Sequence, residues 1–346
     1  MPAGAALYYD PLFLGHDTLS HPESPARVEA CLRLLAGSNL WQLLERPACR
    51  DATEEELGRI HTPAHIERMK RVGERGPVLI LADTVANTGT YAAAVRAAGA
   101  VLGATEAVAR GDFEAAFCLT RPPGHHAVAG APMGFCFFNS VAVAARHAVV
   151  ALGLERVAVV DIDIHHGNGT QDAFYEDPAV LYVSTHQYPY YPGTGHWQEA
   201  GEGGGRGTTL NLSLPGGCGD SEYALAFDEV VLPKLRQYRP GLVLVSAGYD
   251  AHHADPIDGA LMRLSCAGYA ALVARLADAA SELCGGRIVL ALEGGYDLTA
   301  LSWSVRNSIE ALMREPRAGD PVGPAPAAKA PDIGPLLQAV KQLHGL

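Results

Sequence analysis

The sequence predicts an α/β fold in which a central parallel sheet has helices on both faces. Short apolar runs rich in valine, isoleucine and leucine alternate with longer alanine-rich segments, which is the pattern of strands joined by crossover helices. Of the 346 residues, 48% are hydrophobic and 18% are charged, as is typical of globular proteins. Ionisable residues directly follow several of the apolar runs, so we expect the active site at the carboxyl ends of the strands.

Seven apolar segments are expected to form the strands of this sheet. Strands of a parallel sheet are buried on both faces, so their sequences are continuously apolar rather than alternating. In chain order they are residues 5–9, 115–120, 156–161, 180–184, 208–214, 242–248 and 287–293. The alanine-rich segments between them are long enough to form helices. These helices are expected near residues 24–36, 90–110, 139–152, 221–237, 265–284 and 299–314.

The chain is expected to form one large domain with a short tail. Residues 316–335 are rich in proline, alanine and glycine, which is the composition of a linker. The segment after them includes LLQAVKQLHG and predicts a helix. We therefore expect a domain over residues 1–315, a linker over residues 316–335 and a tail helix over residues 336–346.

Composition and charge argue against several classes of partner. The net charge is −12 without any basic cluster, which disfavours direct binding of nucleic acid or of an anionic membrane. No stretch approaches the unbroken apolar run of a membrane span, and the first ten residues lack the basic start of a signal peptide. The seven cysteines are scattered singly, so we expect no disulfide framework, no structural zinc site of cysteines and a reducing, cytoplasmic location. The sequence leaves the oligomeric state open, a homo-oligomer included.

One stretch, VAVVDIDIHHGNGTQ at residues 157–171, joins a buried strand to a group of ionisable side chains. Alternate residues of an extended chain share a face, so Asp161, Asp163 and His165 are expected to point the same way. The end of a parallel strand is where α/β sheets build their sites. A single aspartate here would be explained as a helix cap, but four ionisable residues within six favour a functional site.

Three tandem histidine pairs each follow an expected strand. They are His125–His126, His165–His166 and His252–His253. Another expected strand is followed by EGGYD, which contains Tyr296, and Asp250 precedes the third histidine pair. Because the carboxyl ends of parallel strands meet at one edge of a sheet, these loops are expected to converge. The sequence therefore favours a metal site over a set of unrelated histidines.

The residue types at this edge predict a particular chemistry. Two carboxylates and one imidazole leave coordination positions open for water and substrate, as in catalytic metal sites. Zn²⁺ fits such a set, and oxygen-rich ligation also admits Fe²⁺, Co²⁺ or Mn²⁺. A histidine pair beside the ion would supply a general base and acid, and a tyrosine hydroxyl would stabilise an oxyanion. Together these groups predict metal-assisted hydrolysis of a carbonyl compound, most simply an amide.

Six motifs resemble, in order, the signatures of the histone deacetylase family. They are RPPGHHA (121–127), GFCFFNSVAVAARHA (134–148), DIDIHHGNGTQDAF (161–174), YYPGTG (190–195), SAGYDAHHADP (246–256) and LEGGY (292–296). The resemblance extends from about residue 8 to about residue 315. Within the family, the motifs resemble those of class II and of its bacterial amidohydrolases, which are related to acetylpolyamine amidohydrolases. It implies an arginase/deacetylase fold, a single zinc ion and hydrolysis of the amide of an acetylated lysine or of a similar acylated amine, with release of acetate.

The resemblance implies a role for each residue at the reacting centre. The zinc ligands of the family match Asp163, His165 and Asp250. His126 would be the general base, with His125 as its electrostatic partner and Asp161 orienting His125. Tyr296 would donate a hydrogen bond to the substrate carbonyl and to the oxyanion. Asn168 stands where class I enzymes carry aspartate; because it carries no charge, the pKa of His126 should be lower than beside an aspartate.

Other matching residues would hold the substrate, its product and structural ions. Phe135 and Tyr191 match the aromatic walls around an acyl-lysine chain, and the carbonyl of Gly134 would accept its amide N–H. Ile257 matches a position at the mouth of the tunnel, and Arg27 matches the arginine of an internal cavity for released acetate. Two structural K⁺ sites are implied, one at Asp161, Asp163, His165 and Ser184, the other at Phe174, Asp177 and Val180.

Three alternatives are open at this stage. An acetylpolyamine deacetylase would use the same centre on a different amide. A binuclear manganese ureohydrolase shares the fold but needs a second aspartate where this chain has His252. An inactive acyl-lysine binder is disfavoured because the ligands, the histidine pair and Tyr296 are all present. The pair His252–His253 does not match a family ligand set, so we expect it at the rim of the site or behind its ligands.

Overall fold

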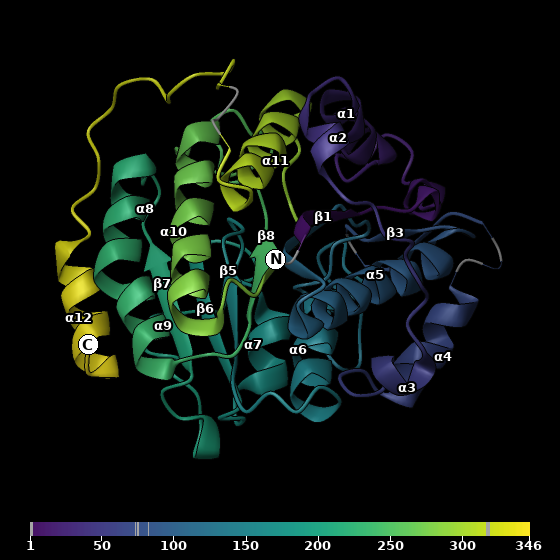
Figure 1. Ribbon diagram of the computed structural model, residues 1–346, viewed down its shortest axis with the longest axis horizontal. Helices are drawn as coiled ribbons and strands as arrows, with labels where there is room; N and C mark the ends of the chain where they lie inside the picture. Colours follow the sequence, from purple (N-terminus) through teal and green to yellow (C-terminus); the bar gives the residue numbers. More distant parts are fainter. Residues whose placement is uncertain (1–2, 73, 75, 82, 316–318) are drawn as a thin grey trace.

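A seven-stranded parallel sheet organises the chain (Figure 1). The computed structural model describes residues 3–72, 74, 76–81, 83–315 and 319–346. The strands are β1 (Ala3–Tyr8), β4 (Phe113–Cys118), β5 (Val157–Asp161), β6 (Val180–Gln187), β7 (Thr209–Leu214), β8 (Val243–Ala247) and β9 (Ile288–Leu292). Their order in the sheet is β1-β4-β9-β8-β5-β6-β7, and all neighbours are parallel. The expected α/β fold class and all seven expected strands are confirmed.

Helices cover both faces of the sheet. Successive strand residues point to opposite faces, so Val157 and Val159 of β5 lie in one core, whereas Ala158 and Val160 lie in the other. The first core is covered by α3 (Glu54–Leu57), α4 (Pro63–Arg71), α5 (Thr90–Arg110), α6 (Ser140–Val150) and α7 (Asn168–Phe174). The second core is covered by α1 (Pro25–Ala36), α2 (Leu40–Leu43), α8 (Asp220–Ala226), α9 (Leu232–Tyr238), α10 (Cys266–Cys284), α11 (Leu298–Leu312) and α12 (Gly334–His344).

The helix expected near residues 221–237 is interrupted. A π-helical turn, Phe227–Val231, separates α8 from α9. Pro233 in the first turn of α9 explains the break, because proline has no N–H to donate and its ring clashes with the carbonyl four residues earlier. The sequence does not predict α2, α3, α4 and α7, nor the antiparallel pair β2 (Val78–Leu79) and β3 (Val85–Ala86), because such short segments show no clear apolar period.

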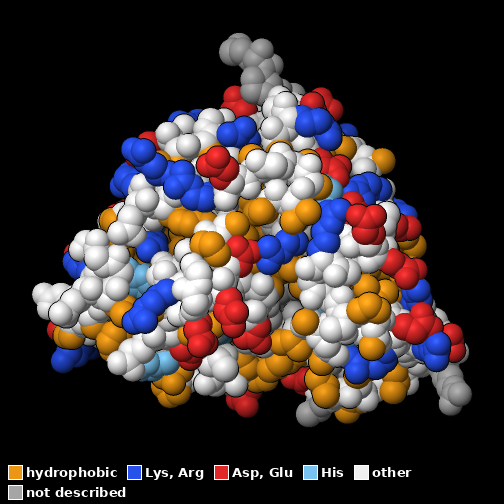
Figure 2. Space-filling view, turned by 90° about the horizontal axis from the view of Figure 1, so that it is seen from below, with side chains coloured by type: hydrophobic (Ala, Val, Ile, Leu, Met, Phe, Trp, Pro, Cys, Tyr) orange, Lys and Arg blue, Asp and Glu red, His pale blue; other side chains and the backbone are white. Residues whose placement is uncertain are grey.

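Helix α5 is the one described helix that is long and apolar enough, by length and composition, to cross a membrane. This finding differs from the expectation that no stretch of the sequence approaches a membrane span. Within the fold, 72% of its most apolar window is buried, so packing against the sheet accounts for its apolar surface. On the face shown in Figure 2, acidic and basic side chains are interspersed rather than gathered into one basic patch.

The tail helix α12 packs beside α8 and α9 at the end of the sheet formed by β7 (Figure 1). Leu337 and Val340 are buried in the second core. Nζ of Lys341 donates a hydrogen bond to Oε2 of Glu229 at 2.5 Å. The tail is thereby fixed by both apolar packing and an ion pair. Residues 316–318 of the expected linker and residues 1–2 of the expected domain lie outside the described residues.

Candidate active site

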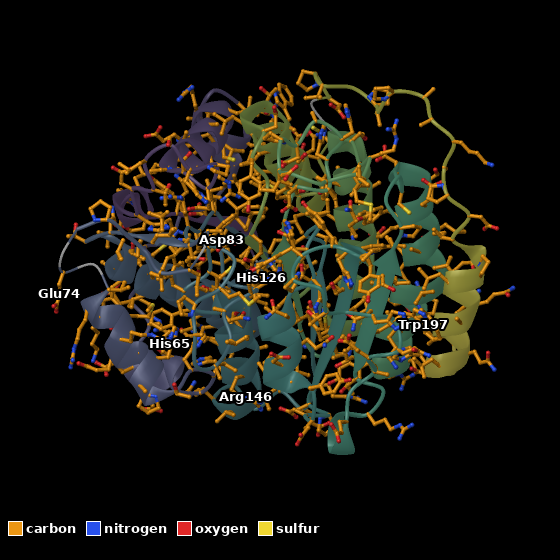
Figure 3. The ribbon with its side chains drawn as sticks, turned by 180° about the vertical axis from the view of Figure 1, so that it is seen from behind. His65, Glu74, Asp83, His126, Arg146 and Trp197 are labelled. Atoms are coloured by element: carbon orange, nitrogen blue, oxygen red, sulfur yellow. The ribbon has the colours of Figure 1, made fainter. Side chains whose placement is uncertain are left out.

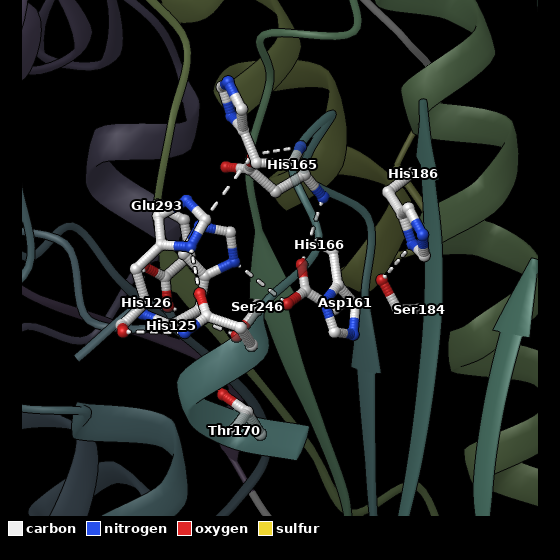
Figure 4. Close-up of polar contacts among 12 residues, drawn as sticks. His125, His126, Asp161, His165, His166, Thr170, Ser184, His186, Ser246 and Glu293 are labelled. Atoms are coloured by element: carbon white, nitrogen blue, oxygen red, sulfur yellow. Dashed lines mark hydrogen bonds and ion pairs between the residues drawn. The ribbon is translucent and has the colours of Figure 1, made fainter. Parts of the chain in front are cut away.

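The carboxyl ends of four neighbouring strands bring the expected site residues together, and Figure 4 shows His125, His126 and His165 among them. The pair His125–His126 follows β4, Asp163 and His165 follow β5, Asp250 follows β8, and Tyr296 follows β9. These strands are adjacent in the order β4-β9-β8-β5. Side chains that are far apart in the sequence therefore meet at one edge of the sheet, as the parallel arrangement requires.

Asp163, His165 and Asp250 form the candidate metal centre. All three are buried, and each offers one ligand atom within 4.8 Å of the other two. Nδ1 of His165 lies 2.9 Å from Oδ1 of Asp163 and 3.1 Å from Oδ2 of Asp250. The backbone of Gly294 passes so close that a Cβ atom there would lie 2.2 Å from Oδ2 of Asp250. Only glycine therefore fits at position 294.

The donor set of this centre fits a divalent cation. Burial raises the pKa of Asp250, and the negative charge of Asp163 raises it further. Burial lowers the pKa of His165, but its interactions with the two carboxylates outweigh burial and raise it to about 9. Apart from the approach of Nδ1 of His165 at 3.1 Å, the buried Oδ2 of Asp250 has no hydrogen-bond partner among the described residues. A divalent ion would compensate both carboxylates and bind this oxygen, and one nitrogen with two oxygens suits Zn²⁺ while admitting Fe²⁺, Co²⁺ or Mn²⁺.

The two histidines of the pair His125–His126 have different electrostatic environments. Nδ1 of His125 lies 3.0 Å from Oδ2 of Asp161, and Nδ1 of His126 lies 2.8 Å from Oδ1 of Asn168. Burial lowers the pKa of His125. The negative charges of Asp161 and Asp163 outweigh burial and raise this pKa well above its usual value. Burial and the neighbouring imidazoles hold the pKa of His126 well below its usual value. A neutral His126 beside a cationic His125 suits a general base and its electrostatic partner.

Replacing Asn168 by aspartate should move the acidic limb of the pH–rate profile to higher pH. The base must be neutral to accept a proton, and a carboxylate in place of the amide 2.8 Å from Nδ1 of His126 would favour the charged imidazolium. The pKa of His126 would rise, and turnover below that pKa would fall. Profiles of kcat/KM against pH for the wild type, Asn168→Asp and the uncharged control Asn168→Ser measure this. An unmoved limb in Asn168→Asp would contradict the assignment of His126 as the base.

Tyr296 borders the site at the end of β9. The residue is 8% exposed, and its ring lies 4.9 Å from the guanidinium of Arg27 and 6.0 Å from the ring of Phe135. Its backbone N–H donates a hydrogen bond to Oδ2 of Asp255 at 2.7 Å. Burial raises the pKa of Tyr296, and Asp250 raises it further. The hydroxyl therefore stays protonated and is available as a hydrogen-bond donor.

A cavity of about 400 Å³ opens onto the candidate metal centre. Four residues expected to contact substrate line it: Gly134, Phe135, Tyr191 and Ile257. The ring of Tyr191 lies 5.1 Å from that of His126. Gly134 has a φ of 51°, and a Cβ atom there would lie 2.4 Å from Cδ2 of His126. The chain can therefore pass this close to the histidine only with glycine at position 134.

The structure adds three cavity residues with polar side chains to those of the expected site. These are Tyr190, Asp83 and Asp258. Tyr190 stacks on His165, with ring centroids 5.0 Å apart at an angle of 17°, and its hydroxyl donates to the carbonyl of Asp258. Figure 3 shows Asp83 close to His126, although Asp83 belongs to the segment between β2 and β3. The two tyrosines before PGTG in the sequence indicate Tyr190 as a cavity residue. No feature of the sequence indicates Asp83 as one.

Glu293 is a further buried carboxyl group beside the histidine pair (Figure 4). Its Oε2 accepts the N–H of Gly124 at 2.6 Å and that of His125 at 3.2 Å, and its Oε1 accepts the hydroxyl of Ser246 at 3.2 Å. Burial raises the pKa of Glu293 to about 7. Glu293 thus fixes the loop of the histidine pair to the end of β9. It lies in the LEGGY motif, but the sequence assigns it no role.

Arg27, which the resemblance assigns to an internal cavity, is buried. Its guanidinium donates to the carbonyls of Glu293 at 2.5 Å and Gly295 at 2.6 Å, and it lies 3.0 Å from the carboxylate of Glu23. Arg121 pairs with the same glutamate at 2.6 Å. Two guanidinium groups therefore share one carboxylate, and a role of Arg27 in holding released acetate stays a prediction.

The residues expected to hold K⁺ lie in two groups near β5 and β6. Asp161, at the end of β5, is in register with Ser184 of β6. Phe174 ends α7, and Asp177 and Val180 follow it on the way into β6. Each group therefore comes from segments that are neighbours in the fold.

The fold and the site together define a class of protein. A parallel sheet that holds two aspartates and one histidine beside a buried histidine pair, at the inner end of a narrow aromatic cavity, is the arrangement of an amidohydrolase that acts on linear amides. The chain belongs to the histone deacetylase family, since residues 21–312 match the histone deacetylase domain. It is a deacetylase of that family, whose members depend on a metal ion.

Relatives and a solved structure agree with this assignment. The chain is 40% identical over 363 aligned positions to "Histone deacetylase 10, chloroplastic" of Oryza sativa subsp. japonica, covering 98% of this chain and 81% of that protein. It is 43% identical over 319 positions to "Histone deacetylase 14, chloroplastic" of Arabidopsis thaliana, covering 87% and 75%. The crystal structure of the HDA15 HD domain superposes with a TM-score of 0.89 at 34% identity, covering 99% of this chain and 94% of that one.

Proposed function

We propose that this chain is a zinc-dependent deacetylase that hydrolyses the amide of an acetylated lysine and releases acetate. The observation that most supports this proposal is a candidate metal centre that shares one cavity with the pair His125–His126, whose Nδ1 atoms face Asp161 at 3.0 Å and Asn168 at 2.8 Å. The linear side chain of acetyl-lysine would lie between Phe135 and Tyr191, both of which line that cavity. Asp163, His165 and Asp250 would hold the Zn²⁺, and K⁺ would be structural.

Each step of the hydrolysis can be assigned to residues of the chain. When bound, the divalent ion would activate the attacking water and polarise the amide carbonyl. His126 would accept the proton of that water, while the positive charge of His125 would stabilise the negative charge that develops nearby. The hydroxyl of Tyr296 would donate a hydrogen bond to the carbonyl oxygen. The protonated imidazole would then return its proton to the leaving amine.

A substrate panel tests the proposed function. kcat/KM would be measured for acetyl-lysine peptides, free acetyl-lysine, acetylputrescine, acetylspermidine and longer acyl-lysines, with the zinc content of the same preparation. We expect the acetyl-lysine peptides to be the best substrates. Absence of turnover on every amide by a zinc-loaded, folded protein would contradict the proposal and favour an inactive binder.

An acetylpolyamine deacetylase is the second candidate function. Asp83 and Asp258 both line the cavity, and carboxylates there would attract the distal ammonium group of a polyamine. Ile257, next to Asp258 in the same lining, offers no charge and would pack against a lysine stem or the flank of a peptide. In the family, a glutamate at this position is associated with polyamine preference. The isoleucine therefore favours a peptide.

Replacing Ile257 by glutamate should shift the preference toward polyamines. A carboxylate at the mouth would pair with the distal ammonium of acetylspermidine, and one partly screened ion pair contributes about tenfold. We expect the ratio of kcat/KM for acetylspermidine to that for an acetyl-lysine peptide to rise about tenfold in Ile257→Glu, but not in the uncharged control Ile257→Gln. A wild-type enzyme that prefers acetylspermidine to every peptide would overturn this order and support the second candidate.

We also propose the setting in which the enzyme acts. All cysteines are free, which suits a reducing cytoplasm. The net charge of −12 and the mixed charges in Figure 2 favour an acetylated substrate as the partner rather than nucleic acid or a membrane surface. Size-exclusion chromatography with light scattering would determine whether the chain is a monomer or a homo-oligomer.

A further inference from the structure

A second group of possible metal ligands lies outside the active site. His252, Cys266 and Asp320 each offer one ligand atom, and these atoms lie within 4.8 Å of one another. His252 is 1% exposed, Cys266 is fully buried and Asp320 is partly exposed. They belong to the loop after β8, the first turn of α10 and the segment after α11. The third tandem histidine pair is thus not brought to the candidate metal centre, and one of its members faces a thiol instead.

The distance between the two softest ligands agrees with tetrahedral zinc. Zn–S and Zn–N bonds of about 2.3 Å and about 2.0 Å at a tetrahedral angle place the sulfur and nitrogen about 3.5 Å apart. Sγ of Cys266 and Nε2 of His252 are 3.5 Å apart. A thiolate, an imidazole and a carboxylate form a ligand set typical of Zn²⁺. Three protein ligands would leave the fourth position to water.

The charges of the group agree with a cation as well. The carboxylate of Asp320 accepts the backbone N–H groups of Ala267, Val322 and Gly323, and no arginine or lysine among the described residues pairs with it. Another group of carboxylates and histidine among the described residues is different. There, Glu56 and Glu106, which lie beside His147, are both paired with Arg50, at 2.7 Å and 2.8 Å, so that group already contains a side-chain cation.

Binding of Zn²⁺ would change the protonation of both His252 and Cys266. Nδ1 of His252 accepts the N–H of Ala254 at 3.1 Å, which places the imidazole proton on Nε2, facing the sulfur. Burial raises the pKa of Cys266 to about 12, so the thiol is protonated without a metal. Binding of Zn²⁺ would release the thiol proton to solvent and move the imidazole proton from Nε2 to Nδ1. The hydrogen bond from Ala254 would then be given up.

We propose that His252, Cys266 and Asp320 form a second zinc site, separate from the catalytic centre, that fastens the segment after α11 to the N-terminal end of α10. The ligands come from three separate parts of the chain, so an ion bound there would cross-link the segment that leads to α12. This site does not depend on the substrate of the enzyme. It predicts two bound ions per chain, only one of which is needed for turnover.

Cobalt substitution tests the site without relying on activity. Protein stripped of metal and reloaded with Co²⁺ should show a thiolate-to-cobalt charge-transfer band in the near ultraviolet, because the second site contains sulfur and the catalytic centre does not. The wild type should bind two ions and show the band. Cys266→Ser should bind one ion, lose the band and keep its deacetylase turnover. Cys284→Ser, which changes a buried cysteine at the other end of α10, should keep both ions and the band.

A second variant keeps the test decisive if Cys266→Ser fails to fold. Asp320→Asn changes a partly exposed residue and keeps the thiol, so the band should require more Co²⁺ than in the wild type while turnover stays the same. Wild-type protein that binds a single ion, or that shows no thiolate band, would overturn the proposal. Retention of both ions or of the band by Cys266→Ser would overturn it as well. None of these outcomes depends on whether the substrate is acetyl-lysine.

Discussion

Asp250→Ala is expected to lose the catalytic ion and deacetylase activity together. Asp250 supplies one of three ligand atoms that lie within 4.8 Å of one another, and two ligands cannot maintain the geometry of the centre. An ion that activates water and polarises a carbonyl contributes several kcal/mol to the transition state. Since each 1.36 kcal/mol is tenfold, kcat/KM should fall by at least about 10³-fold.

The measurement must separate this centre from the proposed second site. Metal content should therefore be determined by mass spectrometry in the Cys266→Ser background, where we expect only the catalytic centre to bind zinc. Asp163→Ala should behave in the same way as Asp250→Ala. Glu293→Gln is the matched control, because Glu293 is a buried carboxyl group of the same site that is not among the three ligands, and it should keep one ion. A full equivalent of zinc in Asp250→Ala would disprove the assigned ligand set.

The sequence predicts the sheet and its active edge because both depend on local features. A strand buried on both faces is continuously apolar, and β5 is followed within four residues by Asp163 and His165. Once such runs are parallel strands of one sheet, their carboxyl ends must converge. The order β4-β9-β8-β5 then brings Asp250 and Tyr296 to Asp163 without further information. This part of the site follows from topology.

The remaining residues of the site depend on tertiary packing that leaves no local pattern. Asp83 reaches the cavity from the segment between β2 and β3, which has no apolar period or motif. Tyr190 and Tyr191 are equivalent in the sequence, yet Tyr190 stacks on His165 and Tyr191 lies edge-on to it. Asp320 lies in a proline-rich segment whose composition indicates only a linker, although its carboxylate lies close to Cys266 and His252. Such contacts can be found only in three dimensions.

Tyr296→Phe is expected to lower kcat by about 10²–10³-fold while the metal content stays unchanged. Removal of one donor to a developing oxyanion has an effect of this size. The hydroxyl is a donor at neutral pH because burial and Asp250 raise the pKa of Tyr296. The ring would stay in place, because its packing against Arg27 at 4.9 Å and Phe135 at 6.0 Å does not involve the hydroxyl. The loss would appear mainly in kcat, since the hydrogen bond is stronger to the oxyanion than to the ground-state carbonyl.

Tyr190→Phe is the matched control for this prediction. It also removes one tyrosine hydroxyl from the lining of the cavity, but that hydroxyl donates to the carbonyl of Asp258 rather than to the reacting carbonyl. Its kcat should therefore fall by less than about tenfold, because only one ordinary hydrogen bond is lost. If Tyr296→Phe turned over at the wild-type rate, Tyr296 would have no part in stabilising the oxyanion. Equal losses of kcat in the two variants would instead indicate that both hydroxyls act by maintaining the shape of the cavity.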